Sequence, residues 1–381
     1  MTGKALDGYR EVLDRLESES RRRSVRGDAP EEMTDMSSND YLGLGARGSE
    51  FDAELSALCP DAGFTSSASR LLAGRQSHYR MLESYLEEQY GRPALLFNSG
   101  YHANVGCASA LAIPGTLFVA DKAIHASVLD GFAVGKADFR RFTHNDMDAL
   151  RRILDRHAAG YERVIVVVES IYSMDGDETP LRELAAIKRE YPGLLLYLDE
   201  AHGVGVRGSR GLGLAEELGV ADGFDLIVGT FGKALASAGA FVIASPLLID
   251  FLVNTARSFI FSTALPPVCA ARSLLMMRKA AGMEEERRHL ARLADMLRDG
   301  LHRMGLSTGN STSQIVPLIV GDAARTLRIS AKLREAGFDA LAIRRPTVAA
   351  GTERIRFSLN SSLSESDIST LLTVLKTILE S

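Results

Sequence analysis

The stretch LLLYLDEAH, residues 194–202, decides the fold. Its apolar part is too short for a helix of its own, and it ends abruptly in two carboxylates and a histidine. This pattern indicates a buried parallel strand that delivers polar groups at its carboxyl end. Ligands bind at that edge of open α/β sheets. Asp199 and His202 are therefore candidate site residues.

Short apolar runs continue on both sides of this stretch. They alternate with segments long enough for helices and span residues 94–97, 116–120, 164–168, 226–229 and 240–243. A helix is expected over 79–90, and another after Asn145, which is a candidate N-cap. The alternation predicts an α/β fold with a mostly parallel sheet, covered by helices on both faces.

The rhythm changes after residue 267. A charged helical region over about 268–305 is followed by strands at 315–320, 341–343 and 354–359 and by helices that include a closing one over about 365–379. We expect three parts: an N-terminal helix and arm (1–38), a large domain (39–267) and a smaller α+β domain (268–381). The apolar spacing of Leu6, Tyr9, Val12, Leu13 and Leu16 predicts an amphipathic helix that packs on the body.

Composition excludes several classes of function. The 381 residues carry 44 basic and 49 acidic side chains, a formal net charge of −5, which argues against nucleic acid as a partner. No apolar segment approaches the length of a membrane span. Three widely separated cysteines fit neither a disulfide framework nor a paired-cysteine metal site. We expect a cytoplasmic protein without a metal.

Two nucleotide-binding interpretations of the central stretch are weak. Asp-Glu-Ala-His also occurs in one helicase group, but the required phosphate loop is missing, because Lys233 is followed by Ala234 and lies downstream. The run GVGVRG at 203–208 matches a dinucleotide fingerprint, with Asp222 and Asp225 as ribose carboxylates. A lone match of this kind is weak, and the polar strand end precedes these glycines. We disfavour a dehydrogenase.

Pyridoxal phosphate (PLP) explains more of the pattern. This cofactor requires a lysine, a carboxylate for its ring nitrogen, a ring to stack on and an anion site for its phosphate. Lys233 lies 34 residues after Asp199, on the next strand-to-loop transition, among small residues. The segment Ser99-Gly100-Tyr101 opens a helix after a strand and can bind a phosphate. His125 follows another strand and could stack on the ring.

Each of these residues also has an ordinary structural explanation. A lone lysine is usually a solvated surface group, a lone histidine is more often structural, and Asp199 or Asn145 could simply cap a helix. Taken singly, His125 and Ser99 favour that explanation. Taken together at strand ends, the set favours the cofactor.

The residues resemble the α-oxoamine synthases, a family of fold-type I PLP enzymes. The likeness runs in family order through SSNDYLGLG (37–45), SRLLAG (69–74), LLFNSGYHANVG (95–106), ADKAIHASVLDG (120–131), FTHNDMDAL (142–150), ESIYSMDGDETPL (169–181), LDEAHGVGVRGSRGLG (198–213), TFGKALASAGAF (230–241) and FSTALPP (261–267). It implies a large PLP-binding domain with a seven-stranded sheet, and a homodimer with shared active sites. Tyr79 and Ala236 stand where the family commonly has histidine and glycine.

The resemblance also implies roles for individual residues. Lys233 would carry PLP, Asp199 would pair with the ring nitrogen, and His125 would stack on the ring. The remaining cofactor contacts would come from His202, Ser173, Gly100, Tyr101 and Thr230, with Ser262 or Thr263 from a partner subunit. Arg356 would bind the carboxylate of the amino acid. The acyl substrate would meet Arg344, Thr347, Asn39 and Arg21, although the segment between Arg23 and Ser37 is shorter than usual.

The C-terminal segments QIVPLIVGD (314–322) and AIRRPTVAAGTERIRFSLN (342–360) narrow the implied reaction. They resemble family members that condense L-alanine with a pimeloyl thioester, on coenzyme A or a carrier protein, with loss of carbon dioxide. Glycine C-acetyltransferase and 5-aminolevulinate synthase activities are the alternatives within the family. A non-catalytic subunit, the alternative from another class, is disfavoured because Lys233, Asp199 and His202 are all present.

Overall fold

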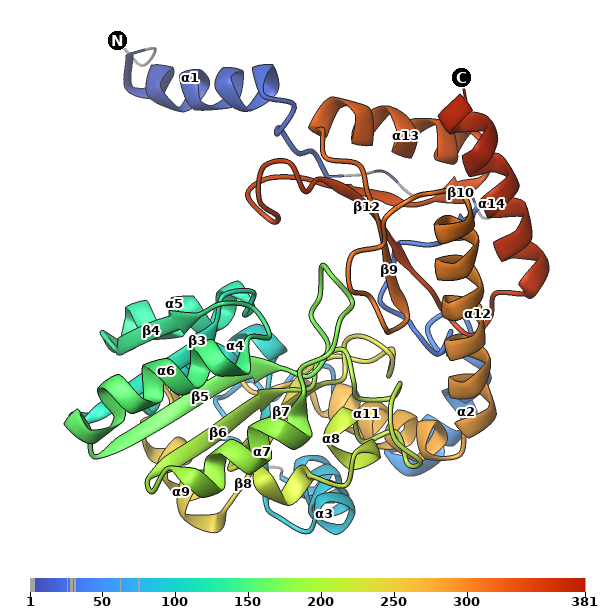
Figure 1. The fold of residues 1–381 in the computed structure, drawn as a ribbon. Helices are drawn as coiled ribbons and strands as arrows, with labels where there is room; N and C mark the ends of the chain where they lie inside the picture. Colours follow the sequence, from blue (N-terminus) through green and yellow to red (C-terminus); the bar gives the residue numbers. More distant parts are fainter. Residues whose placement is uncertain are drawn as a thin grey trace. The chain divides into compact units, whose positions relative to one another are not determined.

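The computed structural model divides into two compact units, which are described separately (Figure 1). It describes residues 4–25, 27, 30, 32–61, 63–74 and 76–380. The larger unit contains Asp40–Ser173 and Asp177–Arg288, and the smaller contains Met1–Asn39, Met174–Gly176 and His289–Ser381. The predicted boundary after residue 267 falls at the start of α11 (Pro267–Ala281), which packs against α3 (Ser77–Tyr90) in the larger unit.

A seven-stranded sheet forms the centre of the larger unit. Its order is β2-β8-β7-β6-β5-β3-β4, and all neighbouring pairs are parallel except those that involve β8. The strands are β2 (Ala94–Phe97), β3 (Thr116–Asp121), β4 (Asp138–Phe142), β5 (Arg163–Glu169), β6 (Leu194–Asp199), β7 (Leu226–Thr230) and β8 (Ala240–Ala244). The predicted fold class and the six predicted strands are confirmed.

Strand β4 was missed because its sequence, DFRRF, has no apolar run. It lies at the edge of the sheet, and four of its five residues are exposed. A strand at the edge of a sheet has a neighbouring strand on one side only. Charged side chains on such a strand discourage pairing with another chain. Strand β5 shows the opposite case. Ile165 and Val167 pack into the main core with Phe118 and Phe132, while Val164 and Val166 are buried against the other face.

Helices cover both faces of this sheet (Figure 1). The remaining helices of the larger unit are α2 (Asp52–Leu58), α4 (Gly100–Ala110), α5 (Ala126–Gly135), α6 (Met147–His157), α7 (Leu181–Glu190), α8 (Leu214–Glu217), α9 (Pro246–Thr255) and α10 (Arg257–Ile260). The predicted cap of α6 was wrong. Asp146, not Asn145, is the N-cap and accepts a hydrogen bond from the Ala149 N–H, because Asn145 adopts a left-handed conformation (φ 53°) and bonds Asp177.

The smaller unit has an α+β organisation. A three-stranded antiparallel sheet has the order β11-β12-β9, with β9 (Ile315–Ile319), β11 (Leu341–Ile343) and β12 (Arg354–Ser358). A short parallel pair joins β1 (Thr34–Asp35) to β10 (Phe338–Asp339). The helices are α13 (Ala323–Glu335), α14 (Glu365–Glu380) and the C-terminal part of α12 (Glu284–Arg303). The predicted C-terminal strands and closing helix are confirmed.

The N-terminal helix α1 (Lys4–Ser18) forms as predicted, and its packing on the body of the protein stays a prediction. Leu6 and Tyr9 are 56% and 72% exposed. The segment after the helix is held instead, because the Arg344 guanidinium donates to the Ser20 carbonyl. The apolar spacing therefore predicted the helix but not what covers it. Within the described residues, none of the helices combines the length and the apolar character that a membrane span requires.

Candidate active site

One cavity of the larger unit brings together seven of the predicted site residues. The carboxyl ends of parallel strands meet at one edge of the sheet, so side chains far apart in sequence converge there. The predicted residues that line the cavity are Gly100, Tyr101, His125, Asp199, His202, Thr230 and Lys233. Asn104, Glu169 and Ala201 complete the lining.

Asp199 ends β6 and is only 4% exposed. The Asn104 side-chain amide donates to its Oδ2 at 2.7 Å, and the Ala201 N–H donates to its Oδ1 at 2.9 Å. Two donors satisfy a buried carboxylate that would otherwise be costly to desolvate. The structure therefore presents an acceptor suited to a protonated ring nitrogen. Asn104 was missed from the sequence, because a single amide in a helical segment carries no pattern.

Lys233 follows the end of β7 and contacts His202. Its Nζ lies 2.9 Å from His202 Nε2, and the Tyr41 hydroxyl lies 2.7 Å from His202 Nδ1. Tyr41 is fully buried, so it holds the imidazole from behind. The loop after Lys233 is tight, and Ala236 adopts φ 42°, a left-handed conformation that glycine accepts more readily.

The N-terminus of α4 lies where the sequence predicts an anion site. Ser99 caps the helix by accepting a hydrogen bond from the His102 N–H at 3.2 Å. The first amides of a helix, here those of Gly100 and Tyr101, have no intrahelical acceptors and favour an anion. Thr230 lies near this helix start, with its Cβ and Oγ1 3.9 Å from where a Cβ on Gly100 would be. A phosphate group fits this donor set.

Glu169 is a second buried carboxyl that the sequence analysis missed. It pairs in register with Asp199 across neighbouring strands. Burial, followed by the charge of Asp199, raises its pKa well above the usual range. Two adjacent buried carboxylates cannot both ionise cheaply. The raised pKa therefore favours the uncharged form of Glu169. Glu169 is the first residue of the segment ESIYSMDGD (169–177), in which the sequence analysis assigned a role only to Ser173.

The loop that follows β5 and contains Ser173 is held by a histidine between two aspartates. His144 Nδ1 and Nε2 lie 2.8 Å from carboxylate oxygens of Asp121 and Asp177, respectively. Burial lowers the pKa of His144, but the hydrogen bonds and charges of these carboxylates outweigh this effect and raise the pKa to about 10. The histidine is therefore charged at neutral pH.

Replacement of His144 by glutamine is expected to lower the free energy of unfolding by about 1–3 kcal/mol at pH 7. The folded-state pKa lies above the unfolded value, so this stabilisation is full below about pH 6.5 and is lost as pH rises toward 10. Denaturant titrations at several pH values, with His157→Gln as the control, would measure it. An equal loss of stability at pH 7 and pH 10 would contradict the charged pair.

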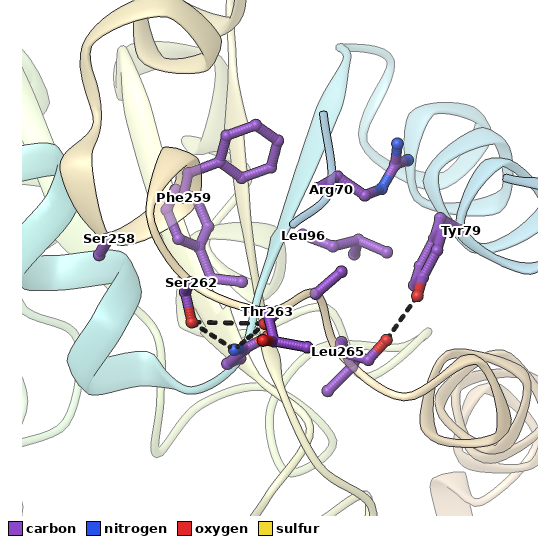
Figure 2. A pocket seen from close by; sticks show the side chains of 11 residues that line it. Arg70, Tyr79, Leu96, Ser258, Phe259, Ser262, Thr263 and Leu265 are labelled. Carbon is purple, nitrogen blue, oxygen red and sulfur yellow. Dashed lines mark hydrogen bonds between the residues drawn. The ribbon is translucent and has the colours of Figure 1, made fainter. Parts of the chain in front are cut away.

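Ser262 and Thr263 line a different pocket of the same unit, shown in Figure 2. The Asn98 side-chain amide donates to Ser262 Oγ at 2.9 Å and to the Thr263 carbonyl at 2.7 Å. Nearby, the Tyr79 hydroxyl donates to the Leu265 carbonyl at 2.6 Å, so the tyrosine is a structural anchor for this segment. Within one chain these two residues do not line the cavity that contains Lys233.

The predicted substrate residues all belong to the smaller unit. Arg356 is buried in β12, and its Nη2 donates to Asn39 Oδ1 at 3.1 Å. Arg344 binds the Ser20 carbonyl at 2.8 Å, and Thr347 accepts from Arg23 at 3.1 Å. Arg21 pairs with its neighbour Glu19. The structure thus joins Arg356 to Asn39, and the substrate roles of these residues stay predictions.

The glycine run 203–208 does not form a dinucleotide site. Helix α8 has only four residues, and Glu200 accepts the amides of Leu214 and Ala215 at its start. A Cβ on Gly203 would lie 2.0 Å from Glu200 Oε2, and a Cβ on Gly205 would lie 2.7 Å from the Cβ of Ala234. These glycines permit close packing beside the Lys233 loop, so the dehydrogenase interpretation was wrong.

Comparisons with known proteins show the family to which this chain belongs. Residues 31–375 match the model of the aminotransferase class I and II family. The putative 8-amino-7-oxononanoate synthase of Pasteurella multocida is 45% identical, over 91% of this chain and 90% of that protein. The 8-amino-7-oxononanoate synthase of Haemophilus ducreyi is 43% identical, over 90% of this chain and 91% of that protein.

Among solved structures, a lysine-to-alanine variant of a serine palmitoyltransferase from S. paucimobilis, with a bound PLP–myriocin aldimine, has a TM-score of 0.88 and 28% identity, covering 99% of this chain and 98% of that one. The chain therefore belongs to the class I and II aminotransferase family of PLP-dependent enzymes, with a fold-type I architecture. Within this family it groups with proteins named 8-amino-7-oxononanoate synthase, which confirms the resemblance to α-oxoamine synthases.

Proposed function

We propose that the protein catalyses the decarboxylative condensation of L-alanine with a pimeloyl thioester to 8-amino-7-oxononanoate, a step of biotin biosynthesis. The observation that carries this proposal is the convergence of Lys233, Asp199 and His202 in one cavity of a chain 45% identical to a relative with that name. A cytoplasmic location stays a prediction from the cysteine pattern.

Bound PLP supplies an electron sink that stabilises negative charge on the α-carbon of the amino acid. Lys233 would hold the cofactor covalently, and its free amine would remove the α-proton as a general base. The Asp199 carboxylate keeps the ring nitrogen protonated. His202, which lines the cavity, would bond the phenolic oxygen together with Ser173, which is not among the residues that line it.

The other residues of the cavity orient the reactants. The amides of Gly100 and Tyr101 and the hydroxyl of Thr230 bind the phosphate, and His125 stacks on the ring. In the smaller unit, Arg356 binds the alanine carboxylate. The acyl substrate is assigned to the other predicted residues of that unit, namely Arg21, Asn39, Arg344 and Thr347.

A substrate panel tests the reaction. Purified protein loaded with PLP is offered alanine or glycine with pimeloyl-CoA, a pimeloyl-carrier protein, acetyl-CoA or succinyl-CoA, and thiol release is measured. We expect the fastest turnover with alanine and one of the two pimeloyl thioesters. Faster turnover of glycine with acetyl-CoA would instead assign glycine C-acetyltransferase activity, and glycine with succinyl-CoA would assign 5-aminolevulinate synthase activity.

An exposed apolar surface around residues 64–72 and 261 supports the proposed homodimer. Phe64, Leu72 and Phe261 are largely exposed, and their segments are adjacent because Ser69 pairs with Thr263. A second copy would remove this surface from water. It would also bring the predicted phosphate ligands Ser262 and Thr263 to an interface.

Replacement of Leu72 by aspartate is expected to convert the dimer to monomer and to weaken PLP binding by roughly 10-fold or more, because a buried charge would face the partner. Sedimentation velocity and PLP titration measure the two effects. Leu247→Asp on α9 is the matched control, since Leu247 is 78% exposed and Leu72 is 80% exposed. A monomeric wild-type protein, or equal dissociation in both variants, would contradict the proposed interface.

A further inference from the structure

A buried hydrogen-bond network connects Asp199 to His125 through two side chains that the reaction scheme above does not use. Asn104 Nδ2 donates to Asp199 Oδ2 at 2.7 Å and to Ser127 Oγ at 3.0 Å. Ser127 Oγ lies 2.7 Å from His125 Nδ1. Asn104 is 2% exposed and Ser127 is fully buried, so water does not compete for these bonds.

The orientation of the Asn104 amide follows from its neighbours. An ionised carboxylate only accepts hydrogen bonds, so the NH₂ group must face Asp199. On the other side, the Tyr197 hydroxyl donates to Asn104 Oδ1 at 2.6 Å. Burial raises the pKa of Tyr197 well above its ordinary value, so the hydroxyl keeps the proton that it donates. One amide proton then bonds Asp199 and the other bonds Ser127.

The bonds that Ser127 makes decide where the proton of His125 lies. The Ser127 backbone N–H donates to His125 Nδ1 at 3.3 Å, so this ring nitrogen is an acceptor. The Ser127 hydroxyl accepts from Asn104 and therefore donates its own proton to the same Nδ1. A ring nitrogen that accepts two hydrogen bonds cannot carry a proton, so the proton of the neutral imidazole is on Nε2.

We propose that Asn104 and Ser127 are positioning residues that hold His125 as the Nε2–H tautomer, so that this histidine donates a hydrogen bond into the cavity. This step rests on the proposed function: the acceptor of the His125 hydrogen bond is the thioester carbonyl oxygen, whose negative charge grows as the carbon nucleophile attacks. A donor placed where charge develops accelerates such a step. The same network places Asp199 and His125 in one rigid unit.

The surroundings of His125 keep its ring neutral. Burial lowers the pKa of His125, and the nearby Lys233 lowers it further, whereas Asp199 and Asp130 act in the opposite direction. The ring is therefore a neutral donor at physiological pH.

The tautomer is measured directly by ¹⁵N NMR of histidine side chains, first without substrate. The protein has eight histidines, and the signals that disappear in His125→Gln identify His125. We expect an unprotonated Nδ1 and a protonated Nε2 in the wild type, with loss of this preference in Ser127→Ala. Ser109→Ala is the matched control, because the Ser109 hydroxyl donates to the Val105 carbonyl within its own helix, α4.

A protonated Nδ1 in the wild type would overturn the proposal, and that measurement needs no variant to fold. In the loaded enzyme we expect Ser127→Ala to lower kcat for thiol release roughly 10-fold or more, with the visible spectrum of bound PLP unchanged. An unchanged kcat with a lost tautomer would overturn the donation to the thioester. If the wild type releases no thiol from any donor, the proposed function fails, and the tautomer assignment is decided separately by NMR.

Discussion

Replacement of Lys233 by alanine is expected to lower turnover by on the order of 10⁴-fold. The variant loses both the amine that carries PLP and the base that removes the α-proton. In the structure its Nζ contacts His202 at 2.9 Å within the cavity. Absorbance spectroscopy of the purified variant should show no visible band of lysine-bound PLP, even after incubation with excess cofactor.

The control for this variant is Lys122→Ala, which removes an exposed lysine from the loop after β3. It should keep the visible band and at least half of the wild-type rate. A Lys233→Ala protein with an undiminished band would show that another lysine carries the cofactor, and the central assignment would then be wrong.

Replacement of Asp199 by asparagine is expected to reduce turnover by on the order of 10³-fold, because the ring nitrogen would lose the charge that keeps it protonated. Asparagine has nearly the same shape but only one acceptor oxygen, so it keeps one of the two hydrogen bonds that Asp199 accepts from Asn104 and from the Ala201 N–H. Stopped-flow or steady-state thiol release measures the rate, and thermal unfolding without PLP measures the fold.

Asp222→Asn is the control for this second variant. Asp222 is an exposed carboxylate, and the abandoned dinucleotide interpretation gave it a ribose-binding role. Its replacement should leave turnover unchanged. Equal losses in the two variants, or an Asp199→Asn enzyme with more than a tenth of the wild-type rate, would contradict the proposed pairing with the ring nitrogen.

Much of the fold could be predicted because local patterns carry it. The apolar runs that became β2, β3, β5, β6, β7 and β8 are buried on both faces, and such strands read as continuous apolar segments. Strand β4 and the two-residue pair β1 and β10 lack that signal, since exposed or very short strands have no apolar run. Their pairing depends on neighbours far away in sequence.

The candidate site divides in the same way. Lys233, Asp199 and His202 stand at strand ends, so their convergence follows from the order of strands. Asn104 and Tyr41 act through hydrogen bonds to side chains 95 and 161 positions away, and neither has a local pattern that predicts this. The sequence indicated only that Asn104 lies in a helix and that Tyr41 lies in a turn.

The sequence by itself determined the α/β class, the strands that carry the site and the set of groups that PLP requires, because each follows from a local period or a strand end. The tertiary structure alone decided which side chains hold those groups in place. It buried Glu169 beside Asp199 and thereby raised the pKa of Glu169. It also joined Asn104, Ser127 and His125 in one network. Such bonds depend on distances across the sheet, which spacing along the chain does not encode.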